Sequence, residues 1–119
     1  MTTEPRIDTF YAKRGGQFSL PIELVMDGDT NFDWSTVSAR CQIRDASRTL
    51  IIEPNCSISG SSGGRAQLLI PFLGSQTAVM PEETFGDVLL ERASPVFGPE
   101  YSPTFRIVLE TPQTNPPTP

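Results

Sequence analysis

The sequence predicts an all-β protein with two packed β-layers and about seven short strands. Apolar and polar residues alternate with a period of two in several short segments, whereas the helical spacing i, i+3, i+4, i+7 is not sustained anywhere. Gly, Pro, Asn and Asp separate these segments. The 12 prolines and 9 glycines among 119 residues also make long helices unfavourable. A small open barrel is the alternative arrangement.

Two strands are expected in the first 25 residues. Residues 7–12 alternate weakly, and the Lys13-Arg-Gly-Gly16 sequence that follows suits a turn because glycine adopts positive φ without strain. Residues 17–25 alternate clearly, with Phe18 and Leu20 beginning the apolar face. Pro21 has no N–H to donate to a neighbouring strand, so Pro21 is predicted either on an edge strand or at a position whose N–H would face away from pairing.

The central region is predicted to form a hairpin. Residues 37–44 alternate between apolar and polar side chains, as a half-buried strand requires. A four-residue turn at 45–48 then leads into a short strand at 49–53, which residues 55–58 extend beyond a break at Pro54.

Three more strands complete the predicted sandwich. The Gly- and Ser-rich segment 59–64 reads as a hairpin loop before the alternating strand 66–72. A single helical turn is expected within residues 74–81, with Ser75 as its N-cap. Strands at 84–92 and 104–110 follow.

The chain length favours one domain over residues 1–110, followed by a proline-rich extended tail at 111–119. Residues 93–103 are predicted to be a long loop carrying Phe97 and Tyr101. The tail and the first six residues have little to bury by themselves, and we expect a partner to order them.

Charge and hydropathy exclude two classes of partner. The net charge of −5 and the pI near 4.6 would repel a phosphate backbone, so nucleic acid is not expected. No apolar run approaches the roughly 20 residues that span a bilayer, and the first residues lack the apolar core of a signal peptide. We therefore predict that the protein does not associate with membranes. We also predict that it is synthesised in the cytosol.

The sequence gives little support for catalysis, cofactor binding or metal binding. The chain contains no His, which is the side chain best suited to proton transfer near neutral pH, and no phosphate-binding or nucleophile motif. Residues 27–33 resemble a calcium loop in their oxygen spacing, but Phe32 and Ser38 stand where that loop needs Gly and Glu. Cys41 and Cys56 are interpreted as structural, either as two buried thiols or as one disulfide.

Candidate contact residues are arginines on a polar strand face, aromatics on or beside loops, and residues of the two termini. Arg40 and Arg44 share the polar face of strand 37–44, where they would otherwise pair with nearby acids. The aromatics would otherwise cap the ends of the sandwich. The full set is Arg6, Phe32, Trp34, Arg40, Arg44, Phe97, Tyr101, Pro112, Pro116 and Pro117.

Several segments resemble a family of small tailed-bacteriophage proteins. They are Arg14-Gly-Gly-Gln-Phe18, Asp33-Trp-Ser-Thr-Val-Ser-Ala-Arg-Cys-Gln-Ile-Arg-Asp45, Gln76-Thr-Ala-Val-Met-Pro81 and the strand that begins near Phe85. These proteins are similar to the immunoglobulin-like N-terminal domain of baseplate upper proteins, which attaches host-recognition parts to the tail. The resemblance implies an immunoglobulin-like β-sandwich and no catalytic residues. Trp34, the long loop at 94–103 and the proline tail depart from the family pattern.

The resulting hypothesis is a structural virion protein of the tail or baseplate that joins a fibre or receptor-binding part. It would be assembled in the host cytoplasm, and its partners would be other virion proteins and copies of itself. A capsid decoration protein is the alternative within this class. A carbohydrate-binding module that stacks host glycans on Trp34, Phe97 or Tyr101 is the alternative from another class.

Overall fold

The computed structural model describes residues 8–114 of the chain. This part contains nine strands, one 3₁₀ turn and one helical turn. The two turns are η1 (Trp34–Thr36) and α1 (Gly74–Thr77). The strands are β1 (Asp8–Lys13), β2 (Phe18–Val25), β3 (Ser38–Arg44), β4 (Leu50–Ile52), β5 (Ser57–Ser62), β6 (Arg65–Phe72), β7 (Glu83–Arg92), β8 (Phe97–Tyr101) and β9 (Phe105–Glu110).

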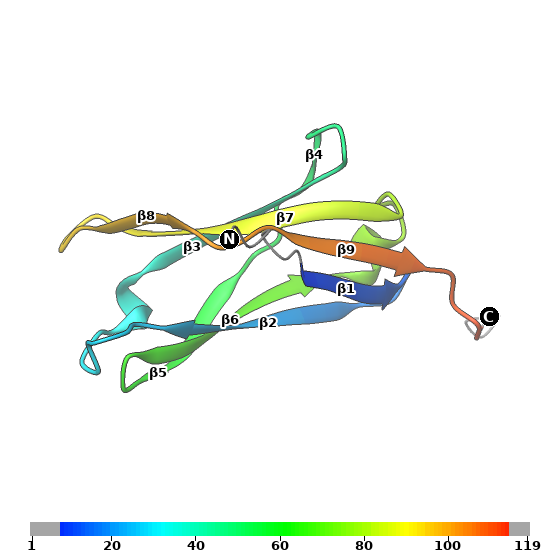
Figure 1. The fold of residues 1–119 in the computed structure, drawn as a ribbon. Coiled ribbons are helices and arrows are strands. Elements are labelled where there is room, and N and C mark those ends of the chain that lie inside the picture. The colour runs from blue at the N-terminus through cyan, green and yellow to red at the C-terminus, as the bar shows by residue number, and fades with distance from the viewer. Residues whose placement is uncertain (1–7, 115–119) are drawn as a thin grey trace, which may run out of the picture.

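The strands form two sheets that pack as a sandwich, which confirms the predicted all-β fold (Figure 1). The larger sheet has the order β1-β9-β7-β3-β4, and β8 pairs with β7 beside this path. The smaller sheet has the order β2-β6-β5. This division of consecutive strands between the sheets is the one expected for an immunoglobulin-like sandwich.

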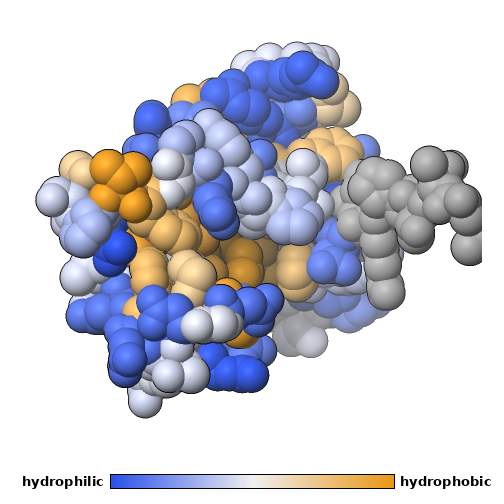
Figure 2. All heavy atoms as spheres, turned by 60° about the vertical axis from the view of Figure 1, so that its left-hand side comes forward, coloured by the Kyte–Doolittle hydropathy of each residue, from blue (hydrophilic) through white to orange (hydrophobic). Residues whose placement is uncertain are grey.

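The core lies between the sheets and is built from alternate residues of the long strands. Along β6, Ala66, Leu68, Ile70 and Phe72 are buried while the residues between them are more exposed. The same alternation in β7 and β9 buries the facing side of the larger sheet. Figure 2, which turns the left-hand end of Figure 1 forward, shows hydrophobic atoms recessed between two hydrophilic layers.

Three details differ from the prediction. The structure has nine strands where about seven were expected, because β8 forms inside the predicted loop at 93–103 and pairs with β7, and because residues 49–58 divide into β4 and β5 on different sheets. The strands are not all antiparallel, since β1 runs parallel to β9. The turn before β6 is also shorter than predicted, because β5 continues to Ser62.

Other local predictions agree with the structure. The strand that contains Pro21 is β2, which lies at the edge of the smaller sheet. The helical turn expected within 74–81 is α1, but its N-cap is Leu73 and not Ser75. The Leu73 N–H donates to Gln76 Oε1 at 2.8 Å, so the glutamine side chain three residues later satisfies the N–H of the N-cap residue itself.

Thr77 joins α1 to the turn between β1 and β2. Its hydroxyl accepts a hydrogen bond from the Gly15 N–H at 3.0 Å and donates to the Gly16 carbonyl at 2.8 Å. Arg14 reaches the same segment from the other side, donating to the Met80 carbonyl at 2.6 Å. These bonds fix the crossover between the two sheets at this end of the sandwich.

Candidate docking face

The outer face of the larger sheet carries a regular grid of polar and aromatic side chains. Strand pairing aligns them in rows across the sheet, because residues paired between strands point to the same side. Between β3 and β7, Arg40 pairs with Leu89, Gln42 with Asp87 and Arg44 with Phe85. Leu89 pairs on its other side with Tyr101 of β8. We call this set the docking face: Arg40, Gln42, Arg44, Phe85, Asp87, Leu89, Tyr101 and Thr104.

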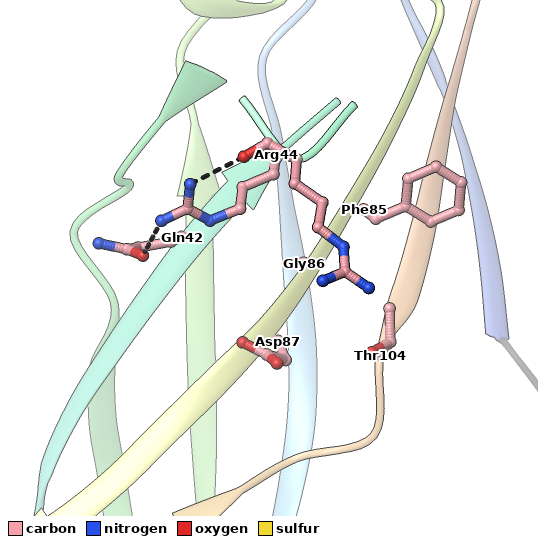
Figure 3. A pocket seen from close by; sticks show the side chains of 7 residues that line it. Gln42, Arg44, Phe85, Gly86, Asp87 and Thr104 are labelled. Atoms are coloured by element: carbon pink, nitrogen blue, oxygen red, sulfur yellow. Dashed lines mark hydrogen bonds between the residues drawn. The ribbon is translucent and has the colours of Figure 1, made fainter. Parts of the chain in front are cut away.

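Two adjoining hollows lie on the docking face. The larger, of about 400 Å³, is lined by Gln42, Arg44, Arg48, Phe85 and Asp87, together with Gly86 and Thr104. The smaller, of about 140 Å³, is lined by Arg40, Gln42, Asp87, Leu89 and Tyr101. Gln42 and Asp87 border both hollows, so the two lie side by side on this face. Figure 3 shows the larger hollow, with Gln42 and Arg44 along one side and Asp87 and Thr104 below.

Arg40 forms an ion pair with Glu53, as one interpretation of the sequence expected. The hydrogen bond from Arg40 is also the main reason that the pKa of Glu53 lies below its ordinary value. Both side chains are substantially exposed, at 61% and 40%. An exposed pair of this kind contributes little to folding, because solvent screens it. Arg40 therefore remains accessible to a partner at little cost.

Arg44 has neutral hydrogen-bond acceptors instead of a carboxylate. Its guanidinium donates to Gln42 Oε1 at 2.8 Å and to the Arg48 carbonyl at 3.0 Å (Figure 3). The second bond ties the tip of the β3–β4 hairpin to β3. The hairpin projects away from the larger sheet (Figure 1), so the larger hollow lies between the hairpin and the outer sheet face. Arg44 thus supports the wall of the hollow. Its charge helps to lower the pKa of the nearby Glu53 carboxyl, but Glu53 forms its ion pair with Arg40 and not with Arg44.

Arg48 is the only non-glycine residue within 8–114 that has a positive φ, 68°. The turn imposes this conformation: the Arg48 N–H donates to the Asp45 carbonyl, and Asp45 Oδ1 accepts from the Ser47 and Thr49 N–H groups. A side chain in this backbone region costs on the order of 1 kcal/mol relative to glycine. The Arg48 side chain has no hydrogen bond or ion pair to another described residue. Its charge is available at the rim of the hollow.

The predicted aromatic contact residues divide into two groups. Phe32, Trp34 and Phe97 form one cluster at the end of the sandwich, with ring centroids 4.9 to 5.7 Å apart. Trp34 is only 3% exposed, and its Nε1–H donates to the Gly64 carbonyl at 2.8 Å. The capping interpretation therefore describes this cluster, and the Trp34 ring does not face a partner or a sugar. Tyr101 is 66% exposed and belongs to the docking face.

The cysteines are free thiols placed close to each other. Cys41 on β3 is fully buried, and burial raises the pKa of its thiol to about 12. Cys56 is half-buried and donates to the Ala39 carbonyl at 3.4 Å. Of the two interpretations that the sequence left open, the structure shows the unpaired thiols. The acidic residues of segment 27–33 also serve local structure in part, since Asp29 accepts from the Asn31 N–H and Asp33 from the Ser35 N–H.

The remaining contact candidates lie in the termini. Pro112 is exposed and follows β9. Arg6, Pro116 and Pro117 lie outside the described residues, so their assignment stays a prediction. Within the described part, no three His, Cys, Asp or Glu residues gather in a group that could hold a metal ion. No helix there is long and apolar enough to cross a membrane.

The structure adds Gln42, Arg48, Phe85, Asp87, Leu89 and Thr104 to the candidate site. The alternation of β7 indicates that Phe85, Asp87 and Leu89 share its outer side. Their alignment with Arg40 and Arg44 depends on the register between β3 and β7, which single-strand patterns do not encode. The sequence matches no protein-family model and no curated protein.

Proposed function

We propose that this protein is a structural, non-enzymatic component of a tailed-phage virion, placed in the tail or baseplate. It would hold a fibre, a receptor-binding part or another subunit through protein contacts. The observation that carries the proposal is the docking face, which brings Arg40, Arg44 and Tyr101 together on one side of the larger sheet. Arginine, tyrosine and other aromatic residues are enriched in protein interfaces and supply most of their binding energy.

The shape of the face also favours a protein partner. Its two hollows are shallow and polar, and their lining mixes arginines, a carboxylate and an exposed tyrosine. Small-molecule sites are typically enclosed and predominantly apolar. The resemblance to phage baseplate proteins supplies the choice of a virion, and the immunoglobulin-like sandwich is compatible with it.

Carbohydrate binding remains a second candidate because of one observation. Tyr101 is exposed beside Arg40, Gln42 and Asp87, and a sugar ring could stack on the tyrosine while its hydroxyls bind the polar groups. Burial of Trp34 removes the aromatic residue on which that hypothesis mainly depended.

The proposal predicts that the chain is present in purified particles of the phage that encodes it. We expect mass spectrometry of density-purified virions to detect the chain in a fixed ratio to the other tail proteins, because a structural subunit occupies symmetric positions. Separation of tails from capsids should place it with the tails. Recovery with the capsids would favour the decoration alternative, and absence from the particles would contradict a structural role.

A further inference from the structure

Exposed charge is distributed unevenly over the molecule. Although the chain has a net charge of −5, the larger hollow is lined by Arg44 and Arg48 against one carboxylate, Asp87. Both guanidinium groups lack a carboxylate partner among the ion pairs of the described residues. The hollow is therefore a basic site on an acidic protein, and a carboxylate from outside would complement it.

The acidic counterpart lies at one end of the sandwich. Asp27 and Asp29 stand in the loop between β2 and η1, which projects at the same end as β8 (Figure 1). Both aspartates are exposed, and a Cβ added at Gly28 between them would meet no atom within 4 Å. Glu91 and Glu100 add exposed carboxylates on β7 and β8. The loop tip is thus acidic, prominent and sterically open.

We propose that copies of this chain associate head to tail, with the Asp27–Asp29 loop of one copy entering the arginine-lined hollow of the next. This inference rests on the proposed function, in which copies repeat around a symmetric particle, and it names the contact. Because donor and acceptor are different surfaces, the contact is heterologous and leads to a ring or an open chain, not to a closed two-fold dimer.

In such a contact, the attraction between the facing carboxylates and arginines outweighs the repulsion between the net charges of the two copies. Both copies carry a charge of −5, but exposed charges farther apart than about 8 Å are largely screened at physiological salt. The carboxylates would face Arg44 and Arg48 directly, where a planar guanidinium can hold a carboxylate through two parallel hydrogen bonds.

The test uses two variants that remove charge while keeping local structure. Arg48→Asn removes the guanidinium, and asparagine tolerates the positive φ at this position. The loop variant Asp27→Asn with Asp29→Asn removes both charges, and its amide oxygen can still accept the hydrogen bond from the Asn31 N–H. Lys13→Gln is the matched control, because Lys13 is an exposed cation on β1, paired with Glu110, and belongs neither to the hollow nor to the acidic loop. Thermal unfolding verifies that each variant is folded.

Sedimentation velocity of the full chain measures the association. At low salt and up to about 1 mM protein, where contacts with a Kd near 1 mM are populated, we expect complexes that grow with concentration and decrease with added salt. Arg48→Asn and the loop variant should each weaken association about tenfold or more, whereas Lys13→Gln should leave it unchanged. An equimolar mixture of the two weakened variants should form one-to-one complexes and nothing larger, because only one native contact remains.

Three results would overturn the inference: a wild-type chain that stays monomeric throughout, association that neither variant weakens, or two variants that fail to complement each other. These results are independent of the particle analysis. A chain found in virions but monomeric in solution would refute the head-to-tail contact alone. A chain that associates as expected but is absent from virions would refute the proposed function.

Discussion

Replacement of Trp34 by Ala should lower the free energy of unfolding by about 3–5 kcal/mol, the largest loss we expect from a single substitution. Trp34 is 3% exposed and packs edge to face against Phe32 and Phe97 at the end of the sandwich. The Arg92 guanidinium lies 4.9 Å from the Phe32 ring centroid, so the cluster extends to β7. Truncation would leave a cavity where η1, β8 and the loop before η1 meet.

Trp34→Phe is the matched control, since it keeps an aromatic ring and removes the indole N–H. The Gly64 carbonyl would still accept a hydrogen bond from the Met26 N–H at 2.8 Å, so no buried acceptor would be left without a partner. We expect a loss of about 1–2 kcal/mol for this variant. Urea unfolding followed by circular dichroism suits both, because Trp34 is the only tryptophan and its fluorescence is lost. A cost below about 1 kcal/mol for Trp34→Ala would contradict the capping role.

Thr77→Val should destabilise the fold by about 2 kcal/mol, because it removes a hydroxyl that satisfies two backbone groups. Thr77 is fully buried, accepts from the Gly15 N–H and donates to the Gly16 carbonyl. Valine has nearly the same shape, so packing should change little while both groups lose their partner. Thermal or urea unfolding gives the magnitude.

Thr84→Val makes the same chemical change as Thr77→Val but should have the opposite effect on the stability of the fold. Thr84 on β7 is also fully buried, but its hydroxyl has no hydrogen-bond partner among the described residues. Removing an unsatisfied buried hydroxyl should stabilise the protein by about 1 kcal/mol. Equal effects of the two substitutions would show that the hydrogen bonds of Thr77 do not determine its contribution.

The strands that bury one face could be predicted from the sequence. In β2, β3, β6, β7 and β9 the hydrophobic period of two is set by burial, so the pattern itself records which side faces the core. β8 shows no such alternating pattern, because its sequence Phe-Gly-Pro-Glu-Tyr is mostly exposed and contains two residues that disfavour strands. It pairs through its backbone with β7, and side-chain patterns do not report that pairing.

The candidate site was predictable only in part. Arg40 and Arg44 were found because they share the polar face of one strand, and Tyr101 because it is an aromatic residue in a segment expected to be a loop. Their meeting depends on β7, which lies between β3 and β8 and sets both registers. Arg48 was missed because positive φ is typical of glycine, and an arginine in that conformation leaves no sequence signal.

The most direct test of the docking face is hydroxyl-radical footprinting of Tyr101 in the free chain and in purified virions. Tyr11 is the internal reference, because both tyrosines are 66% exposed but Tyr11 lies on edge strand β1, which β9 separates from β7, and it lines neither hollow of the docking face. If a partner covers the docking face in the particle, the oxidation of Tyr101 should fall severalfold relative to that of Tyr11. Equal oxidation of Tyr101 in the particle and in the free chain would contradict the account.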